Sequence, residues 1–191
     1  MDNINRNIAS FDDKTQEDLL RMSAEIYRLQ RLTEKSKHYL QGSSRKGLVN
    51  FQFEKVPSIE DLVYDIAFPI GERHGHDIEI DFKDEIGEFS VDIYWFQIIL
   101  KNLVENAYIH GTPPVKVSVW KQKNNLMVRV QDTGKAEMSF EQLTEEFSKG
   151  NKSSGSGLGL SIVNNVIKEW GGSLSFSNEP TTFTLKLPNK E

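Results

Sequence analysis

The 191-residue chain contains no cysteine. This absence excludes disulfide bonds, thiolate metal sites and cysteine nucleophiles, and it fits a reducing compartment. The sequence also lacks any run of about 18 apolar residues, so it predicts no membrane-spanning helix. Residues 1–6 have no apolar stretch of the kind that a secretory signal requires. Together these absences predict a soluble cytoplasmic domain.

Excess positive charge and histidine clusters are missing too. Lys and Arg total 23 against 28 Asp and Glu, which gives a net charge of −5. No basic stripe with interleaved aromatics is present, which argues against nucleic-acid binding. Of the four histidines, only His74 and His76 lie close together, and no third ligand has matching spacing. We therefore expect a solvated loop there and no metal site.

Residues 15–41 have the spacing of a long amphipathic helix. Leu19, Met22, Ile26 and Leu29 follow one another at intervals of three and four residues, as in a coiled-coil seam. One such helix cannot bury its own apolar stripe. It packs either with other helices, in the same chain or between chains, or against its own globular domain.

The remainder of the chain mixes strand and helix patterns without an internal repeat. The strand patterns cluster at hairpin spacing, and the helix patterns come separately. This order predicts an α+β fold, a two-layer sandwich preceded by the long helix. Strands are predicted at 49–53, 78–82, 89–91, 115–119, 126–130, 174–176 and 183–187, and helices at 58–73, 92–110 and 158–170.

A glycine-rich segment, Gly155-Ser156-Gly157-Leu158-Gly159-Leu160, runs directly into the last predicted helix. Glycines at alternate positions let backbone N–H groups turn toward one point, and the helix N-terminus adds partial positive charge there. The pattern predicts a phosphate site, although alone it also suits a flexible connection. It matches neither the dinucleotide-binding fingerprint nor the P-loop.

Two other polar groups stand out. Asn102 and Asn106 are four residues apart and share a helix face, where they suit either a hard cation such as Mg²⁺ or the polar edge of a helix. Asp132 ends a predicted strand. Its carboxylate can accept a hydrogen bond from an exocyclic amine while Gly134 admits a planar ligand, or it can form an ordinary Asx turn.

In this order the motifs resemble the ATP-binding catalytic domain of sensor histidine kinases, in the wider family of type II topoisomerase, Hsp90 and MutL ATPases. The likeness covers about residues 46–188 and implies the Bergerat ATP-binding fold. Residues 102–107 resemble the N box, 132–134 the G1 box, 147–150 the F box and 155–163 the G2 box, and 181–188 are similar to the last strand.

The resemblance implies ATP and Mg²⁺ as cofactors. Asn106 would coordinate Mg²⁺, and Asn102 would lie near the phosphates. Asp132 would receive the adenine amino group, Gly134 would form the floor of the base pocket, and Thr181 would reach adenine through water.

The phosphates would be held by a basic side chain and by backbone amides. Lys149 would approach the γ-phosphate, so that it and Asn102 are the expected catalytic residues. The residues expected to hold the phosphate chain are Gly155, Gly157, Leu158, Gly159 and Leu160.

The sequence departs from the family pattern at several positions. Ala136 replaces the second glycine of the G1 box, and Ile109 stands where a lysine is often found. The segment 150–154 predicts a short lid over the nucleotide. ATP-hydrolysing members carry an acidic base where Asn102 stands, and an amide cannot deprotonate water. Hydrolysis should therefore be slow, and transfer to a protein acceptor preferred.

The N-terminal helix resembles the second helix of the dimerisation and histidine-phosphotransfer hairpin. We therefore divide the chain into a partial hairpin, 1–45, and an ATP-binding domain, 46–191. The acceptor-bearing first helix is not recognisable, and His38 lies near the wrong end to replace it. Self-phosphorylation is accordingly not expected, and the chain is interpreted as a fragment of a longer protein.

The resemblance implies a protein histidine kinase of a two-component system. The expected partners are a response regulator receiver domain and the hairpin of the full-length homodimer, with no nucleic acid and no membrane contact from this segment. The expected location is the cytoplasmic portion of a membrane-anchored parent. The alternatives are a nucleotide-dependent regulatory module or an anti-sigma-type serine kinase on the same fold, or that fold without nucleotide function.

Overall fold

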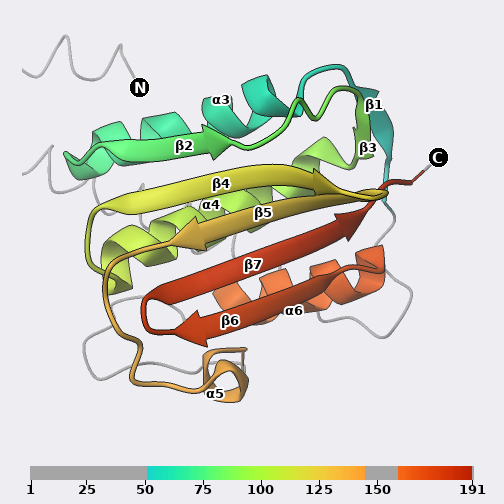
Figure 1. The fold of residues 1–191 in the computed structure, drawn as a ribbon. Coiled ribbons are helices and arrows are strands. Elements are labelled where there is room, and N and C mark those ends of the chain that lie inside the picture. The colour runs from blue at the N-terminus through green and yellow to red at the C-terminus, as the bar shows by residue number, and fades with distance from the viewer. Residues whose placement is uncertain (1–50, 145–158, 191) are drawn as a thin grey trace, which may run out of the picture. The chain divides into compact units, whose positions relative to one another are not determined.

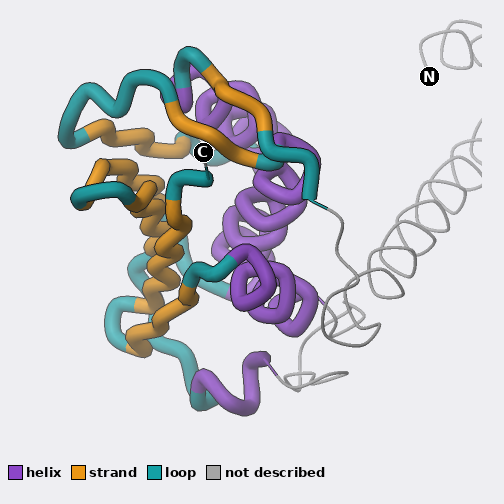
Figure 2. The backbone as a smooth tube through the Cα atoms, turned by 90° about the vertical axis from the view of Figure 1, so that its right-hand side faces the viewer, coloured by secondary structure: helices purple, strands orange, loops and turns teal. Residues whose placement is uncertain are grey.

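The computed structural model of the chain describes residues 51–144 and 159–190. The predicted N-terminal helix, the boundary near residue 45 and residues 147–158 of the F and G2 boxes lie outside these ranges. The described part is a layer of strands covered on one face by helices (Figures 1 and 2). This arrangement confirms the predicted α+β two-layer sandwich.

The main sheet has five strands in the order β2-β4-β5-β7-β6 (Figure 1). The pair β2–β4 is parallel, and the other three pairs are antiparallel. The predicted hairpin joins β4 and β5, with Lys123 in its turn at a φ of 55°. The strands are β2 (Ile78–Phe82), β4 (Val115–Gln122), β5 (Asn125–Gln131), β6 (Ser173–Asn178) and β7 (Thr181–Pro188).

Three longer helices pack on one face of this sheet: α3 (Ile59–His74), α4 (Ile93–His110) and α6 (Gly159–Trp170) (Figure 2). Two of them begin where the sequence provides a capping side chain. Ser58 Oγ accepts the N–H of Asp61 at 3.1 Å, and Asp92 Oδ1 accepts the N–H of Trp95 at 3.0 Å. The helix starts predicted from these residues are confirmed.

The core lies between the sheet and the helices. Alternate residues of β4 and β5 point toward the helices and are fully or almost fully buried, as period-two alternation requires. On α4, Phe96, Ile99 and Leu103 are fully buried against them. Because α4 packs against the central strands β4 and β5, the positions of its polar residues are fixed relative to the sheet.

The strand predicted at residues 49–53 is wrong in position. The strand β1 (Glu54–Val56) begins later and pairs with β3 (Phe89–Val91) in a separate two-stranded sheet. Phe51 and Phe53 lie outside it, with ring centroids 5.4 and 5.3 Å from that of Trp170. The alternating aromatics therefore indicate two half-buried rings packed against the buried Trp170 at the end of α6, and not a sheet face.

A short helix, α5 (Phe140–Thr144), was not predicted. It begins with a reciprocal capping box, in which Gln142 N–H donates to Ser139 Oγ at 3.3 Å and Ser139 N–H donates to Gln142 Oε1 at 2.9 Å. The apolar period over these few residues is too short to mark a helix. Among the helices of the described part, none has the length and apolar character needed to cross a membrane.

Candidate functional site

Asp132 follows the end of β5 and is only 2% exposed. Its Oδ1 atom accepts two backbone hydrogen bonds, from Thr112 N–H at 3.1 Å and from Gly134 N–H at 2.7 Å. Its other oxygen, Oδ2, accepts no hydrogen bond from the described residues. A buried carboxylate that is fixed through one oxygen, and whose other oxygen has no donor in the described part of the chain, is suited to receive a donor from a ligand.

Gly134 packs directly against this carboxylate and against Thr112. A Cβ atom at this position would lie 2.8 Å from Asp132 Oδ1 and 2.9 Å from Thr112 Oγ1. Both separations are shorter than van der Waals contact, so any side chain would displace one of these groups. The close packing requires glycine at this position, and the role of Gly134 toward a flat ligand stays a prediction.

Thr181, at the start of β7, is tied to the same loop. Its carbonyl accepts the N–H of Asp132 at 3.0 Å, and its own N–H donates to the carbonyl of Gly134 at 2.9 Å. Strand alternation places Thr181 and Asp132 on the helix side of the sheet, because their neighbours Thr182 and Gln131 pair on the outer side. The structure thus brings Thr181 beside Asp132 and Gly134.

The two asparagines of α4 lie one helical turn apart and are both half-buried. Asn102 donates from Nδ2 to the carbonyl of Ile98 at 2.8 Å. A Cβ atom on Gly159 would be 2.8 Å from Asn102 Oδ1, so the N box directly touches the first residue of α6. The side chain of Asn106 has no hydrogen-bond partner among the described residues, which leaves its amide oxygen available to a ligand.

Sequence reasoning gave no role to Glu105, which precedes Asn106 on α4 and is 5% exposed. Its Oε1 atom is 3.6 Å from Nη1 of Arg73 on α3, an ion pair that joins the two helices beside Asn106. Burying a carboxylate is costly unless it is paired. The signal available in the sequence was a charged residue among the apolar positions of an amphipathic helix.

The two departures from the family pattern have different consequences. The N–H of Ala136 donates to the carbonyl of Asn178 at 3.0 Å, and its φ is not positive, so the backbone there does not require glycine. Ile109 is 50% exposed and follows Asn102 and Asn106 on the same helix face. An apolar side chain therefore borders the asparagine end of the site.

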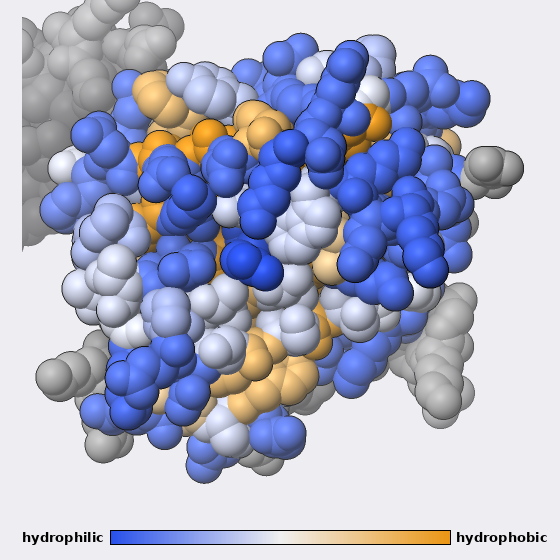
Figure 3. Space-filling view, viewed as in Figure 1, coloured by the Kyte–Doolittle hydropathy of each residue, from blue (hydrophilic) through white to orange (hydrophobic). Residues whose placement is uncertain are grey.

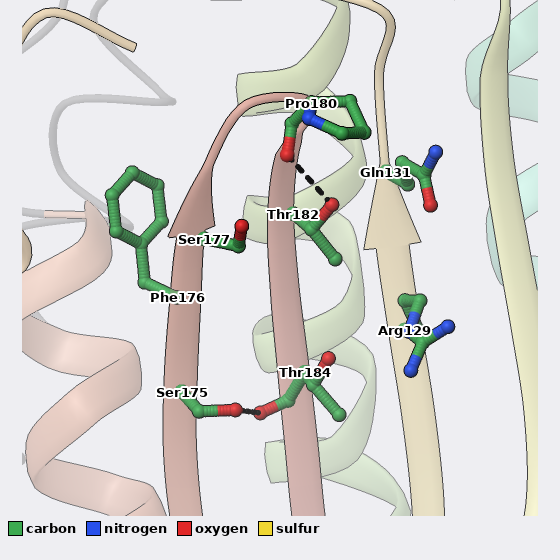
Figure 4. Close-up of a pocket in the computed structure, with 8 residues that line it drawn as sticks. All are labelled: Arg129, Gln131, Ser175, Phe176, Ser177, Pro180, Thr182 and Thr184. Atoms are coloured by element: carbon green, nitrogen blue, oxygen red, sulfur yellow. Dashed lines mark hydrogen bonds between the residues drawn. The ribbon is translucent and has the colours of Figure 1, made fainter. Parts of the chain in front are cut away.

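The sheet's outer face carries a separate hollow of about 310 Å³ (Figure 4). It lies on the face turned away from the helices, which is largely hydrophilic (Figure 3). Arg129 stacks there with its Cζ atom 5.1 Å from the ring centroid of Trp120. This hollow is on the opposite side of the sheet from Asp132 and contains none of the predicted site residues. Its lining residues are Arg129, Gln131, Ser175, Phe176, Ser177, Pro180, Thr182 and Thr184.

The described residues fit an adenine nucleotide with a magnesium ion. Asp132 offers Oδ2 beside Gly134, and Asn106 offers an amide oxygen on the helix face shared with Asn102; neither atom has a partner within the described ranges. Magnesium accepts few protein ligands when phosphate and water complete its shell. No cluster of three or more His, Asp or Glu that could bind a metal occurs in residues 51–144 and 159–190.

Of the other residues predicted to bind phosphate, some lie in the described part of the chain and some lie outside it. Gly159 and Leu160 open α6, and the first N–H groups of a helix have no acceptor within the helix and suit an anion. The other predicted residues, Lys149, Gly155, Gly157 and Leu158, lie outside the described residues. Their roles remain predictions.

Residues 91–191 match the family model described as histidine kinase-, DNA gyrase B- and HSP90-like ATPase. The sensor histidine kinase VxrA of Vibrio cholerae is 30% identical over 88% of this chain and 32% of its own length. The signal transduction histidine-protein kinase AfsQ2 of Streptomyces coelicolor is 38% identical over 57% of this chain and 22% of its length. The chain thus spans a third or less of these relatives.

Solved structures share the fold at lower identity. The histidine kinase AdeS of Acinetobacter baumannii has a TM-score of 0.72 at 18% identity, covering 100% of this chain and 93% of its own. Full-length ShkA, solved in complex with AMPPNP, has a TM-score of 0.78 at 19% identity over 94% of this chain and 40% of its own. Histidine kinase ThkA, solved with the response regulator protein TrrA, has a TM-score of 0.66 at 22% identity over 94% and 53%.

The family match and the likeness to solved structures agree with the observed sheet and helix arrangement. The chain belongs to the family of histidine kinase-, DNA gyrase B- and HSP90-like ATPases, and its described part is an ATP-binding domain of that family.

Proposed function

We propose that the chain is the kinase part of a two-component sensor histidine kinase, which transfers the γ-phosphate of ATP to a histidine on a separate helical hairpin. The observation that carries the proposal is the carboxylate of Asp132, which is fixed through Oδ1 while its Oδ2 accepts no hydrogen bond from residues 51–144 and 159–190. Its position beside Gly134 suits recognition of an adenine amino group. The relatives VxrA and AfsQ2, both named as histidine kinases, support the same activity.

The base end of the nucleotide would be bound by the loop after β5. Asp132 would accept the adenine amino group at Oδ2, and Gly134 would lie against the ring. Thr181 would contribute through a water molecule. Because Asp132 is already held by two backbone N–H groups, little reorganisation would be needed when the base binds.

The phosphate end would be bound by α4, by the start of α6 and by the predicted lid. Asn106 would ligate Mg²⁺, which neutralises charge on the phosphates when bound. Asn102 would orient the phosphates beside Gly159 and Leu160. From outside the described residues, Lys149 would approach the γ-phosphate, and the amides of Gly155, Gly157 and Leu158 would complete the cradle.

The site offers positioning and charge, and the N box supplies no base to activate water. The amide of Asn102 cannot accept a proton in the way a carboxylate can. The chain should therefore hold ATP without rapid hydrolysis until an acceptor side chain approaches. Phosphoryl transfer is mainly a matter of alignment and electrostatic stabilisation, which these residues are arranged to give.

The phosphorylated histidine would pass its phosphoryl group to an aspartate of a response regulator receiver domain. The solved complex of ThkA with TrrA is an assembly of this kind on the same fold. The acceptor hairpin would belong to the full-length homodimer. Because the donor is ATP, we place this activity in the cytoplasm.

The proposal is tested first by nucleotide binding. Calorimetric titration of the chain with ADP and ATP, with and without Mg²⁺, should give binding that falls at least tenfold in Asp132→Asn. The variant keeps the size of the side chain but turns an amide donor or a weaker acceptor toward the adenine amine. Equal affinities for the parent and the variant would contradict the site assignment.

Phosphotransfer is tested separately. The chain is incubated with γ-labelled ATP, alone and together with a hairpin that carries the acceptor histidine. We expect acid-labile label on the hairpin and none on the chain itself. Label retained on the chain alone, or acid-stable label on a serine, would favour a serine kinase instead.

A further inference from the structure

Gly111 follows the last residue of α4 and lies directly against Asp132. A Cβ atom built on Gly111 collides with both Cγ and Oδ2 of Asp132, and it would also lie 2.5 Å from the carbonyl oxygen of Ala107. We propose that Gly111 is a positioning residue for base recognition: its missing side chain leaves the space in which Asp132 presents Oδ2 to adenine. This inference rests on the proposed nucleotide binding and assigns a determinant of base specificity within it.

Space, not backbone conformation, is what requires glycine here. Gly111 has a φ of −92° and a ψ of −164°, an extended conformation that any residue can adopt. A side chain at this position is therefore excluded only by what surrounds it. The excluding atoms are a helix carbonyl and the carboxylate that the proposed function assigns to adenine.

The helix carbonyl cannot easily give way. Ala107 belongs to α4 and is 7% exposed, and its carbonyl already accepts the N–H of Gly111 at 3.1 Å. Moving this oxygen would open the last turn of α4. The side-chain carboxylate of Asp132 is the more movable neighbour, so it would take most of the displacement.

The turn that follows Gly111 is also held in place. Thr133 N–H donates to the carbonyl of Thr112 at 2.9 Å, and Thr133 Oγ1 donates to the carbonyls of Thr112 and Pro113, each at 3.0 Å. These bonds join the turn to the loop that carries Asp132. The turn therefore cannot swing outward to make room, and a methyl group at residue 111 would push Oδ2 from its position.

The predicted consequence is specific to the base. Inosine nucleotides lack the 6-amino group of adenine but keep the same ribose and phosphates. At C6 they carry a carbonyl oxygen, which cannot donate to Asp132 Oδ2 as the adenine amino group would, so displacing this atom should weaken the binding of ADP and not that of IDP. A general loss of stability would lower both affinities together.

The test is calorimetric titration of the whole chain with Mg-ADP and with Mg-IDP. The parent should prefer ADP by about tenfold or more, the worth of one hydrogen bond to a charged group. In Gly111→Ala the preference should fall to near unity through weaker ADP binding, with IDP binding nearly unchanged.

The matched control is Gly172→Ala. Its Cβ would also collide with a backbone carbonyl, that of Lys186, but at the far end of α6 from Asp132. It should lower the melting temperature and leave the ADP-to-IDP ratio as in the parent. If Gly111→Ala does not fold, the same titrations are carried out on Thr133→Val. This variant removes the hydroxyl hydrogen bonds to the turn while it keeps the volume of the side chain. It should lower the ratio by a smaller factor.

The possible results distinguish failure of the proposed nucleotide binding from failure of the proposed role of Gly111. A parent chain that binds neither nucleotide overturns the proposed function and this inference with it. The inference alone is overturned if the parent prefers ADP and a folded Gly111→Ala keeps the full preference. If Gly111→Ala does not fold, the same result in Thr133→Val overturns it. Loss of the preference in the variant, with the control unchanged, establishes Gly111 as a determinant of base specificity.

Discussion

Asn102 and Gly159 touch across two helices, so closely that a Cβ atom at residue 159 would lie 2.8 Å from the side-chain oxygen of Asn102. This contact joins the asparagine face of α4 to the N-terminus of α6. Residues 57 positions apart in the chain thereby form one edge of the candidate phosphate site. The space between them is as small as a glycine permits.

Gly159→Ala should therefore weaken binding of the phosphates and leave base recognition intact. The added methyl displaces Asn102, while alanine at the start of a helix costs nothing in intrinsic helix propensity. We expect the affinity for ATP to fall about tenfold and that for adenosine to remain unchanged, with a melting temperature close to the parent's. A parallel loss for adenosine would indicate damage to the whole domain instead.

Asn106→Ala should remove the magnesium dependence of ATP binding. The amide of Asn106 has no protein partner to lose among the described residues, so the substitution should cost little stability. In the parent, replacing Mg²⁺ with EDTA should weaken ATP binding; in the variant the two conditions should give similar, weak affinities. Gln97→Ala, an exposed change on the same helix, is the control and should retain the parent's response. A variant that still responds fully to Mg²⁺ would remove Asn106 from the metal site.

Ile109→Lys should strengthen ATP binding by about fivefold at low salt. Ile109 is 50% exposed in the last turn of α4, where a positive charge also interacts favourably with the helix dipole. A lysine there would face the same side as Asn102 and Asn106 and attract the phosphates, an effect of roughly 1 kcal/mol that salt screens. The gain should vanish at high ionic strength and be absent in Ile109→Met. A salt-independent gain would point to packing and not to charge.

Asp92→Ala should lower the free energy of unfolding by about 2 kcal/mol. Asp92 is 4% exposed and accepts two backbone N–H groups, from Gln52 at 2.7 Å and from Trp95 at 3.0 Å. It caps the helix that carries both site asparagines. Asp92→Asn keeps only one acceptor oxygen and should lose about half as much. Denaturant unfolding followed by circular dichroism measures both, and equal stability of all three proteins would show that the cap contributes little.

Most of the fold could be predicted because its signals are local. Ser58 and Asp92 mark helix starts by capping chemistry, and the alternating valines of β4 and β5 mark a half-buried sheet. The parallel pairing of β2 with β4 could not be predicted, since it depends on how α4 crosses the sheet between them. The alternation at Phe51 and Phe53 led to a wrongly predicted strand for the same reason. Both rings pack against Trp170, which lies more than a hundred residues later in the chain.

The candidate site was predictable where its residues carry chemistry of their own. Asp132, Asn102 and Asn106 are polar groups in apolar surroundings, and the order of their motifs is distinctive. Gly111 and Glu105 were missed, because a lone glycine after a helix and a single charge within one are common. Their importance depends on what the fold places against them, Asp132 in one case and Arg73 in the other.

The length of the last turns of α4 sets a distance within the proposed site. Asn106 and Gly111 are five residues apart on α4 and its end, an axial distance of about 7.5 Å. The proposed metal ligand thus lies on α4, the residue that borders the proposed base-binding carboxylate directly follows that helix, and the helix pitch fixes the span between them. A single inserted residue would turn these two ends by about 100° relative to each other. In the proposed complex, the pitch of α4 would therefore set the distance between the metal ligand and the carboxylate that binds the base.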